Sequence, residues 1–86
     1  MTVSLGFYVY SYTAPASVFL SPYASETGGT ISKIELYNGS TLITTLTNGA
    51  YYIWDNLALG NYSVTAKAYD SHNNTATSAP AIFTIY

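Results

Sequence analysis

The stretch that decides the fold is Leu57-Ala-Leu-Gly60-Asn-Tyr62-Ser-Val64-Thr-Ala66-Lys-Ala68-Tyr-Asp70. Gly60 marks a turn, and the segment after it alternates, with Tyr62, Val64, Ala66 and Ala68 on one face and Ser63, Thr65, Lys67 and Tyr69 on the other. A period of two residues is typical of a strand with one buried face. The small side chains of Ala66 and Ala68 leave room for larger ones from a facing sheet. The stretch therefore predicts a half-buried strand packed against a second sheet.

Shorter segments on both sides of this strand alternate in the same way and are separated by turn signals. Further strands are predicted at residues 3–12, 17–24, 31–37, 41–47, 51–55 and 81–86. Their inward side chains are expected to include Val18, Leu20, Ile34, Leu36, Leu42, Leu46, Tyr52, Trp54, Phe83 and Ile85. Turns or loops are predicted at Asn38-Gly39, Asn48-Gly49, 26–29 and 71–75. This pattern has no helical period and predicts an all-β sandwich of seven to eight antiparallel strands.

The N-terminal segment, residues 3–12, is unusually rich in aromatic side chains. Its core side is expected to carry Val3, Leu5, Phe7 and Val9, and its outer side Tyr8, Tyr10 and Tyr12. Alternate residues of a strand lie about 7 Å apart, so the three tyrosines would form a ladder. The proline in Thr13-Ala-Pro15 is expected to end this strand because it removes a ladder donor. Pro22, in the next strand, predicts an edge or a bulge.

Five segments of the chain carry a resemblance to a known family. They are Thr13-Ala-Pro-Ala-Ser-Val18, Gly29-Thr-Ile-Ser-Lys-Ile-Glu-Leu-Tyr-Asn-Gly-Ser-Thr-Leu42, Trp54-Asp-Asn-Leu57, Gly60-Asn-Tyr-Ser-Val-Thr-Ala-Lys-Ala-Tyr-Asp70 and Ala76-Thr-Ala-Thr-Ser-Ala-Pro80. With these segments the chain resembles a bacterial immunoglobulin-like domain, a module found on secreted glycoside hydrolases, adhesins and phage structural proteins. The resemblance implies one Greek-key sandwich over residues 1–86, with 1–12 as a divergent, aromatic-rich N-terminal strand.

The same resemblance assigns structural roles to four residues. Leu57, Gly60 and Tyr62 stand at the spacing of a tyrosine corner, in which a tyrosine packs its ring into the core and bonds its hydroxyl to nearby backbone. Trp54, which lies in one of the matching segments, is expected to face the core together with Tyr52. Family members also carry several aspartates in the loop before the Gly-Thr-Ile segment. Here that loop is Ala24-Ser-Glu-Thr-Gly-Gly29, which argues against an inherited calcium site.

Composition excludes several classes of function. The chain of 86 residues is long enough for one domain, has no cysteine, and carries a net charge of −2 with two lysines as its fixed cations. Two lysines are too few to form the basic patch that binds nucleic acid or an anionic membrane. The N-terminal residues resemble neither a signal peptide nor a membrane span. Charged residues make up only 7% of the chain and aromatics 16%, so the surface must consist largely of Ser, Thr, Asn and Tyr. Such a surface is typical of a Thr-rich extracellular β protein, or of a protein whose surface is largely covered in use.

Candidate catalytic and metal-binding residues are few. His72 is the only imidazole, and a polar loop around it favours a solvated side chain over a catalytic one. Glu26 and Asp70 are expected at the same end of the sandwich, with Asn73 and Asn74 nearby. Calcium prefers six to eight oxygen ligands with several carboxylates, and two acids fall short. We therefore expect no enzyme activity, no metal and no cofactor.

The outward tyrosines, which elsewhere in the chain are Tyr23, Tyr37, Tyr51 and Tyr69, allow three interpretations: an ordinary half-exposed strand surface, a sugar-stacking platform, or a protein interface. For the scattered tyrosines the ordinary strand surface is favoured. For Tyr8, Tyr10 and Tyr12 a protein interface is favoured, because the opposite face of their strand is also apolar.

These observations lead to a functional prediction. The chain is expected to be a non-catalytic attachment module that decorates or cements a larger extracellular assembly. With Met1 as the true start, a phage capsid decoration protein is preferred, located on the virion surface or extracellular. Its expected partners are a capsid or cell-surface protein, or further copies of itself. The alternative is an excised spacer or carbohydrate-binding module of a secreted polysaccharide-degrading enzyme or adhesin.

Overall fold

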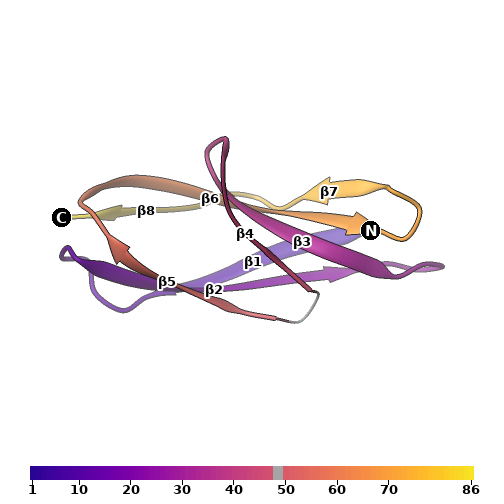
Figure 1. Cartoon of the computed structure of the whole chain (residues 1–86), viewed down its shortest axis with the longest axis horizontal. Coiled ribbons are helices and arrows are strands. Elements are labelled where there is room, and N and C mark those ends of the chain that lie inside the picture. Colours follow the sequence, from indigo (N-terminus) through magenta and orange to yellow (C-terminus); the bar gives the residue numbers. More distant parts are fainter. Residues whose placement is uncertain (48–49) are drawn as a thin grey trace.

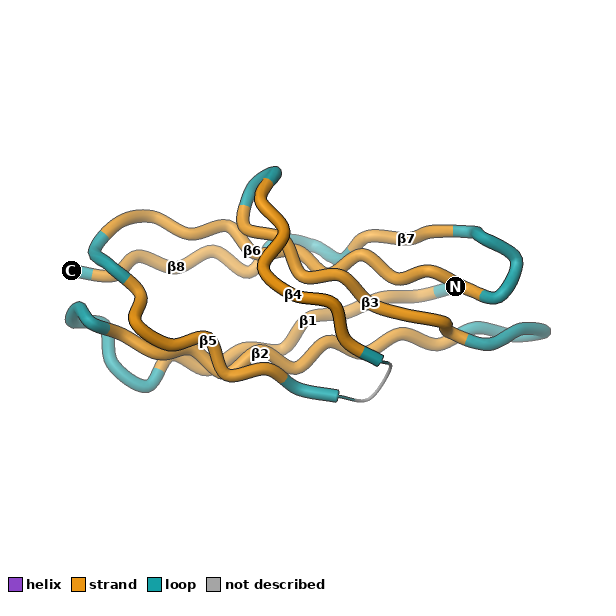
Figure 2. The backbone as a smooth tube through the Cα atoms, viewed as in Figure 1, coloured by secondary structure: helices purple, strands orange, loops and turns teal. Residues whose placement is uncertain are grey.

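The computed structural model describes residues 1–47 and 50–86, so the turn predicted at Asn48-Gly49 lies outside the described residues. The described residues form eight strands in two sheets (Figures 1 and 2). The strands are β1 (Thr2–Val9), β2 (Ala16–Ser25), β3 (Ile31–Asn38), β4 (Thr41–Leu46), β5 (Tyr52–Leu57), β6 (Gly60–Asp70), β7 (Thr75–Thr77) and β8 (Ala81–Ile85). The smaller sheet has the order β1-β2-β5, and the larger has β4-β3-β6 with β7 and β8 both paired to β6. Each of these pairs is antiparallel, which confirms the predicted all-β sandwich.

Strand β6 is the centre of the larger sheet, as its alternation predicts. Val64, Ala66 and Ala68 are fully buried on its inner face. The largest buried side chains that share the core with them are Val18 and Leu20 from β2, Ile34 and Leu36 from β3, and Ile85 from β8. The small alanines of β6 thus lie in a core filled by branched side chains from both sheets, which is how alternating large and small residues reach close packing.

The N-terminal strand is shorter than predicted. It ends at Val9, and Tyr12 lies in the connection that follows. The Tyr12 carbonyl accepts a hydrogen bond of 2.7 Å from the Tyr86 amide, and the Ala14 amide donates one of 2.8 Å to the Tyr86 carbonyl. The chain therefore leaves the smaller sheet after Tyr10 and pairs with the end of the larger one, so residues 3–12 cannot form one continuous strand.

Two side chains predicted to face the core are largely exposed. Leu42 in β4 is 49% exposed, because the register shifts between Leu36 and Tyr37 and moves Leu42 opposite Tyr37; Ile43 packs against the core instead. Phe7 does turn inward and stacks on Phe83 at 5.8 Å, but it is 42% exposed. β1 and β8 are edge strands of the two sheets, so the Phe7 ring packs at the margin of the sandwich.

Pro22 is accommodated as the sequence predicts for a local edge. Its ring is buried, and its register partner in β1 is Leu5. The pairing of β2 with β5 runs only from Ala16 to Leu20, so the backbone at Pro22 has a strand on one side only. Pro22 has no amide hydrogen to donate, and no hydrogen bond of the sheet is lost because no strand lies on that side to accept one.

The turn between β5 and β6 has the geometry that the tyrosine-corner spacing predicts. The Tyr62 hydroxyl donates a 2.6 Å hydrogen bond to the Ala58 carbonyl, and Leu57 is buried beneath the turn. Gly60 has a φ of +146°, which side-chain-bearing residues rarely adopt. The Tyr62 ring stacks on Phe83 at 5.2 Å and meets Trp54 edge-on at 5.6 Å. One tyrosine thus joins strands from both sheets.

The molecule is elongated, with principal extents of 43 × 20 × 16 Å. The N- and C-termini lie toward opposite ends of its long axis (Figure 1). None of the described residues belongs to a helix that is long and apolar enough to cross a membrane.

Candidate functional site

The outer face of the smaller sheet carries a row of apolar side chains that crosses all three strands. In the register, Tyr8 of β1 lies opposite Phe19 of β2, and Phe19 lies opposite Ile53 of β5. Tyr10 extends this surface, because its amide donates to the Ser17 carbonyl and continues the ladder beyond β1. We call this surface the aromatic face and define it as Tyr8, Tyr10, Phe19, Tyr51 and Ile53.

The rings of the aromatic face contact one another in two pairs. Tyr8 and Tyr10 lie 5.3 Å apart with an interplanar angle of 70°. Phe19 and Tyr51 lie 5.3 Å apart with an angle of 33°. Stacking along a glycan needs coplanar rings presented side by side. The edge-on arrangement of Tyr8 and Tyr10 does not provide that, and it suits an irregular protein surface better.

The aromatic face is nearly free of charge. Its neighbour Asp55, on β5, accepts a 2.9 Å hydrogen bond from the Ser17 hydroxyl at the margin of the face. The two lysines of the chain, Lys33 and Lys67, lie on β3 and β6 of the other sheet. A partner for the aromatic face therefore gains contact area there and little electrostatic attraction.

The structure separates the three tyrosines that the sequence groups together. Tyr8 and Tyr10 are adjacent, but no ring contact joins Tyr12 to either of them among the described residues. The sequence did not assign Phe19, Tyr51 or Ile53 to a partner-binding surface. Phe19 and Tyr51 are outward in the predicted alternation, but only the strand register places Phe19 beside Tyr8, and Tyr51 joins the surface through its contact with Phe19. The partner-binding role of the tyrosines stays a prediction.

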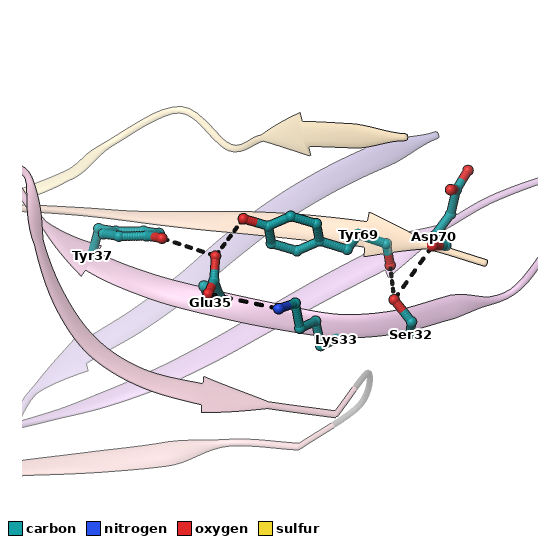
Figure 3. Close-up of polar contacts among 6 residues, drawn as sticks. All are labelled: Ser32, Lys33, Glu35, Tyr37, Tyr69 and Asp70. Atoms are coloured by element: carbon teal, nitrogen blue, oxygen red, sulfur yellow. Dashed lines mark hydrogen bonds and ion pairs between the residues drawn. The ribbon is translucent and has the colours of Figure 1, made fainter. Parts of the chain in front are cut away.

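The outer face of the larger sheet has a different chemistry (Figure 3). Glu35 accepts hydrogen bonds from the hydroxyls of Tyr37, at 2.8 Å, and Tyr69, at 2.5 Å. The bond from Tyr69, followed by that from Tyr37, holds the pKa of Glu35 below its ordinary value. Lys33 lies 3.9 Å from Glu35 and 4.6 Å from the centre of the Tyr69 ring, and Lys67 approaches the same ring at 5.3 Å. The cations of the chain are thus engaged in a cross-strand network.

Asp70 organises the loop at one end of the sandwich. Its side chain is 2% exposed and accepts bonds from the backbone amides of His72, at 2.9 Å, and Asn74, at 2.7 Å. The Asn74 side-chain amide donates a further bond of 3.0 Å. A hydrogen bond from Glu26 is the largest cause that lowers the pKa of Asp70, and the bonds from the loop add to it. Asp70 therefore acts as the cap of the loop at 71–74.

Glu26 comes from the loop after β2 and lies against Asp70, as the sequence predicts for two acids at the same end. Its Oε2 atom is buried and no donor reaches it, so an ionised Glu26 would be partly unsatisfied. When protonated, Glu26 donates to Asp70, and this hydrogen bond, with burial, raises the pKa of Glu26. A side chain at Gly29 would meet the Glu26 carboxyl group and His72. Among residues 1–47 and 50–86, no three acidic or histidine side chains are placed to hold a metal ion.

The structure is similar to a chain from "Structures of Clostridium thermocellum CbhA fibronectin(III)-like modules", with a TM-score of 0.83 and 24% identity over 98% of this chain and 94% of that one. This likeness confirms the immunoglobulin-like sandwich. The family model described as "Bacterial Ig domain" matches residues 10–84, so the chain belongs to the bacterial Ig domain family. A search of curated proteins gives no match.

Proposed function

We propose that this chain is a non-catalytic spacer module of a larger extracellular protein. The observation that carries the proposal is the placement of the termini toward opposite ends of a body 43 Å long (Figure 1). A module with this geometry continues the chain along its long axis, and so it holds the parts before and after it apart. Met1 and Tyr86 are both exposed, so flanking segments join without disturbing the core.

The family and the chemistry of the surface support a non-catalytic role. Bacterial Ig and fibronectin III-like modules are generally accessory domains of larger enzymes or adhesins. The buried or clustered acids have structural partners: Asp70 caps a loop, and Glu35 accepts from two tyrosines. The predicted phage capsid decoration protein finds no support in the comparisons, and the spacer module, which was the alternative, is favoured.

The proposal is tested by small-angle scattering on two copies of the chain fused head to tail. A spacer predicts that the longest dimension grows by about one module length, 43 Å, relative to the single copy. The same fusion with Tyr8→Ser in both copies is the matched control, because it removes a ring that could hold the two copies side by side. If the longest dimension of both fusions stays close to that of one copy, the modules fold back on each other and the spacer proposal is wrong.

A pull-down with insoluble polysaccharides tests the carbohydrate-binding function. A spacer predicts that the chain stays in the supernatant with cellulose, chitin and xylan. Retention on one of these polymers that Tyr8→Ser abolishes would instead assign the module to carbohydrate binding.

A further inference from the structure

Gly6 is a glycine that the fold of the single chain does not require. It lies inside β1, on the outer side of the strand, and its register partner is Ser21 of β2. Its φ is not in the left-handed region. An added Cβ would meet only Ser21, at 3.6 Å from the carbonyl oxygen and 4.0 Å from Cβ, which is ordinary van der Waals contact.

A glycine inside a strand weakens the strand, because it brings conformational freedom and no side chain to pack. Where no turn, bulge or clash within the fold explains it, such a glycine often marks a place where a ligand or another chain approaches closely. We define the notch as Gly6 and Ser21. It lies between the pair Tyr8 and Phe19 on one side and Tyr23 on the other.

We propose that the aromatic face and the notch form a self-association surface, in which Tyr8 of each copy rests on Gly6 of the other. A two-fold axis that lies between the two facing sheets, perpendicular to β1 and level with Phe7, relates the positions of these two residues. The same surface then serves both copies, as an isologous dimer requires. Tyr8 and Gly6 are two residues apart on one face, about 7 Å. The Tyr8 ring of each copy therefore lies opposite the notch of the other copy, and the two contacts form at the same time. The inference does not depend on the spacer function.

The charge distribution favours a second copy as the occupant. A face-to-face dimer would bring two uncharged surfaces together, and Asp55 lies at the margin with its own hydrogen-bond partner. The chain carries only six charged side chains in all, four acids and two lysines, so little repulsion opposes pairing. A strongly acidic or basic partner would find no complementary charge on this face.

The exposed area is also sufficient for a weak dimer. Tyr8, Tyr10 and Tyr51 are 63%, 54% and 61% exposed. With the rest of the aromatic face and Tyr23, the surface offers about 600 Å² per copy, which is the upper end for patches on stable monomers. Two copies would bury about 1,200 Å², the lower limit for specific interfaces. We therefore expect a dissociation constant of about 10 μM to 1 mM.

The experiment is sedimentation equilibrium from about 10 μM to 1 mM, with thermal melting of every variant. Gly6→Val fills the notch with a residue that suits a strand, so we expect an unchanged or higher melting temperature and at least tenfold weaker association. Tyr8→Ser is expected to weaken association to a similar degree. Two controls are matched to these variants. Tyr12→Ser removes another exposed ring, which lies outside the aromatic face, and Ser63→Val adds a β-branched side chain to the opposite sheet. Both are expected to leave the dissociation constant within twofold.

Dilution of the unaltered chain, followed by amide NMR, tests the surface without any variant. The proposal predicts concentration-dependent shifts at Gly6, Tyr8, Phe19 and Ser21, and no strong dependence on salt. A chain that stays monomeric at 1 mM, or a dimer indifferent to Gly6→Val, would overturn it. Association that falls steeply with salt would also overturn it, by placing the contact on the lysine-bearing sheet. A β-1,4-linked glucose hexamer that shifts these signals in a monomeric chain would assign the face to a glycan and end the proposal.

Discussion

Replacing Tyr62 by phenylalanine removes one oxygen atom from the tyrosine corner and leaves its ring in place. The hydroxyl donates to the Ala58 carbonyl at 2.6 Å, and the ring is held between Phe83 and Trp54. We expect the variant to fold with the same sheets and to lose the free energy of one hydrogen bond.

The expected loss follows from the surroundings of the bond. The bond is exposed, so water can hydrate the Ala58 carbonyl once the hydroxyl is gone. The net cost should therefore be about 1 kcal/mol, the ordinary value for one hydrogen bond, and not the larger cost of a buried unsatisfied group. For a domain of this size that corresponds to a fall of about 4–8 °C in melting temperature.

Urea unfolding and calorimetry measure this difference. Tyr23→Phe is the matched control, because the Tyr23 hydroxyl is exposed and has no hydrogen-bond partner among the described residues; we expect its effect to stay below about 0.5 kcal/mol. Tyr62→Ala also removes the ring and should cost about 3–5 kcal/mol. If Tyr62→Phe is as mild as Tyr23→Phe, the corner hydrogen bond adds nothing to stability and our account of the turn is wrong.

Three further predictions concern the core and the loop end. Trp54→Ala should cost about 3 kcal/mol in urea unfolding, because the half-buried ring packs edge-on against Tyr62; a fully stable variant would contradict this packing. Because the pKa of Glu26 is raised in the folded state, its contribution to the free energy of unfolding is complete below pH 4.5 and is lost as the pH rises through the raised pKa. The pKa of Asp70 is lowered, so its contribution to that free energy is lost only as the pH falls below 3.8. Glu26→Gln keeps a donor toward Asp70 and should flatten the fall of melting temperature above pH 4.5; an unchanged profile would show that Glu26 does not cause it. Millimolar calcium or a chelator should leave the melting temperature unchanged, because two carboxyl groups are too few for a site, and a shift of several degrees would refute this.

The sequence by itself determined the elements and their inward faces where a local rule governs them. The alternation after Gly60 predicts β6, because side-chain direction in a strand depends only on the parity of the residue. The tyrosine corner is also local, since Tyr62 and its acceptor Ala58 are four residues apart and joined by one turn. Such features need no knowledge of the partner strands.

Only the tertiary structure decided which side chains meet across strands. Register is set by turns and core packing over long separations, and a shift of one residue reverses every side chain, as β4 shows where Leu42 turns outward. The same register places Tyr8 beside Phe19 and assembles the aromatic face, while the early end of β1 leaves Tyr12 outside it. The notch at Gly6 follows likewise from its pairing with Ser21. Alternation along one strand carries no information about the neighbouring strand, so these surfaces emerge only when the sheets close on their shared core.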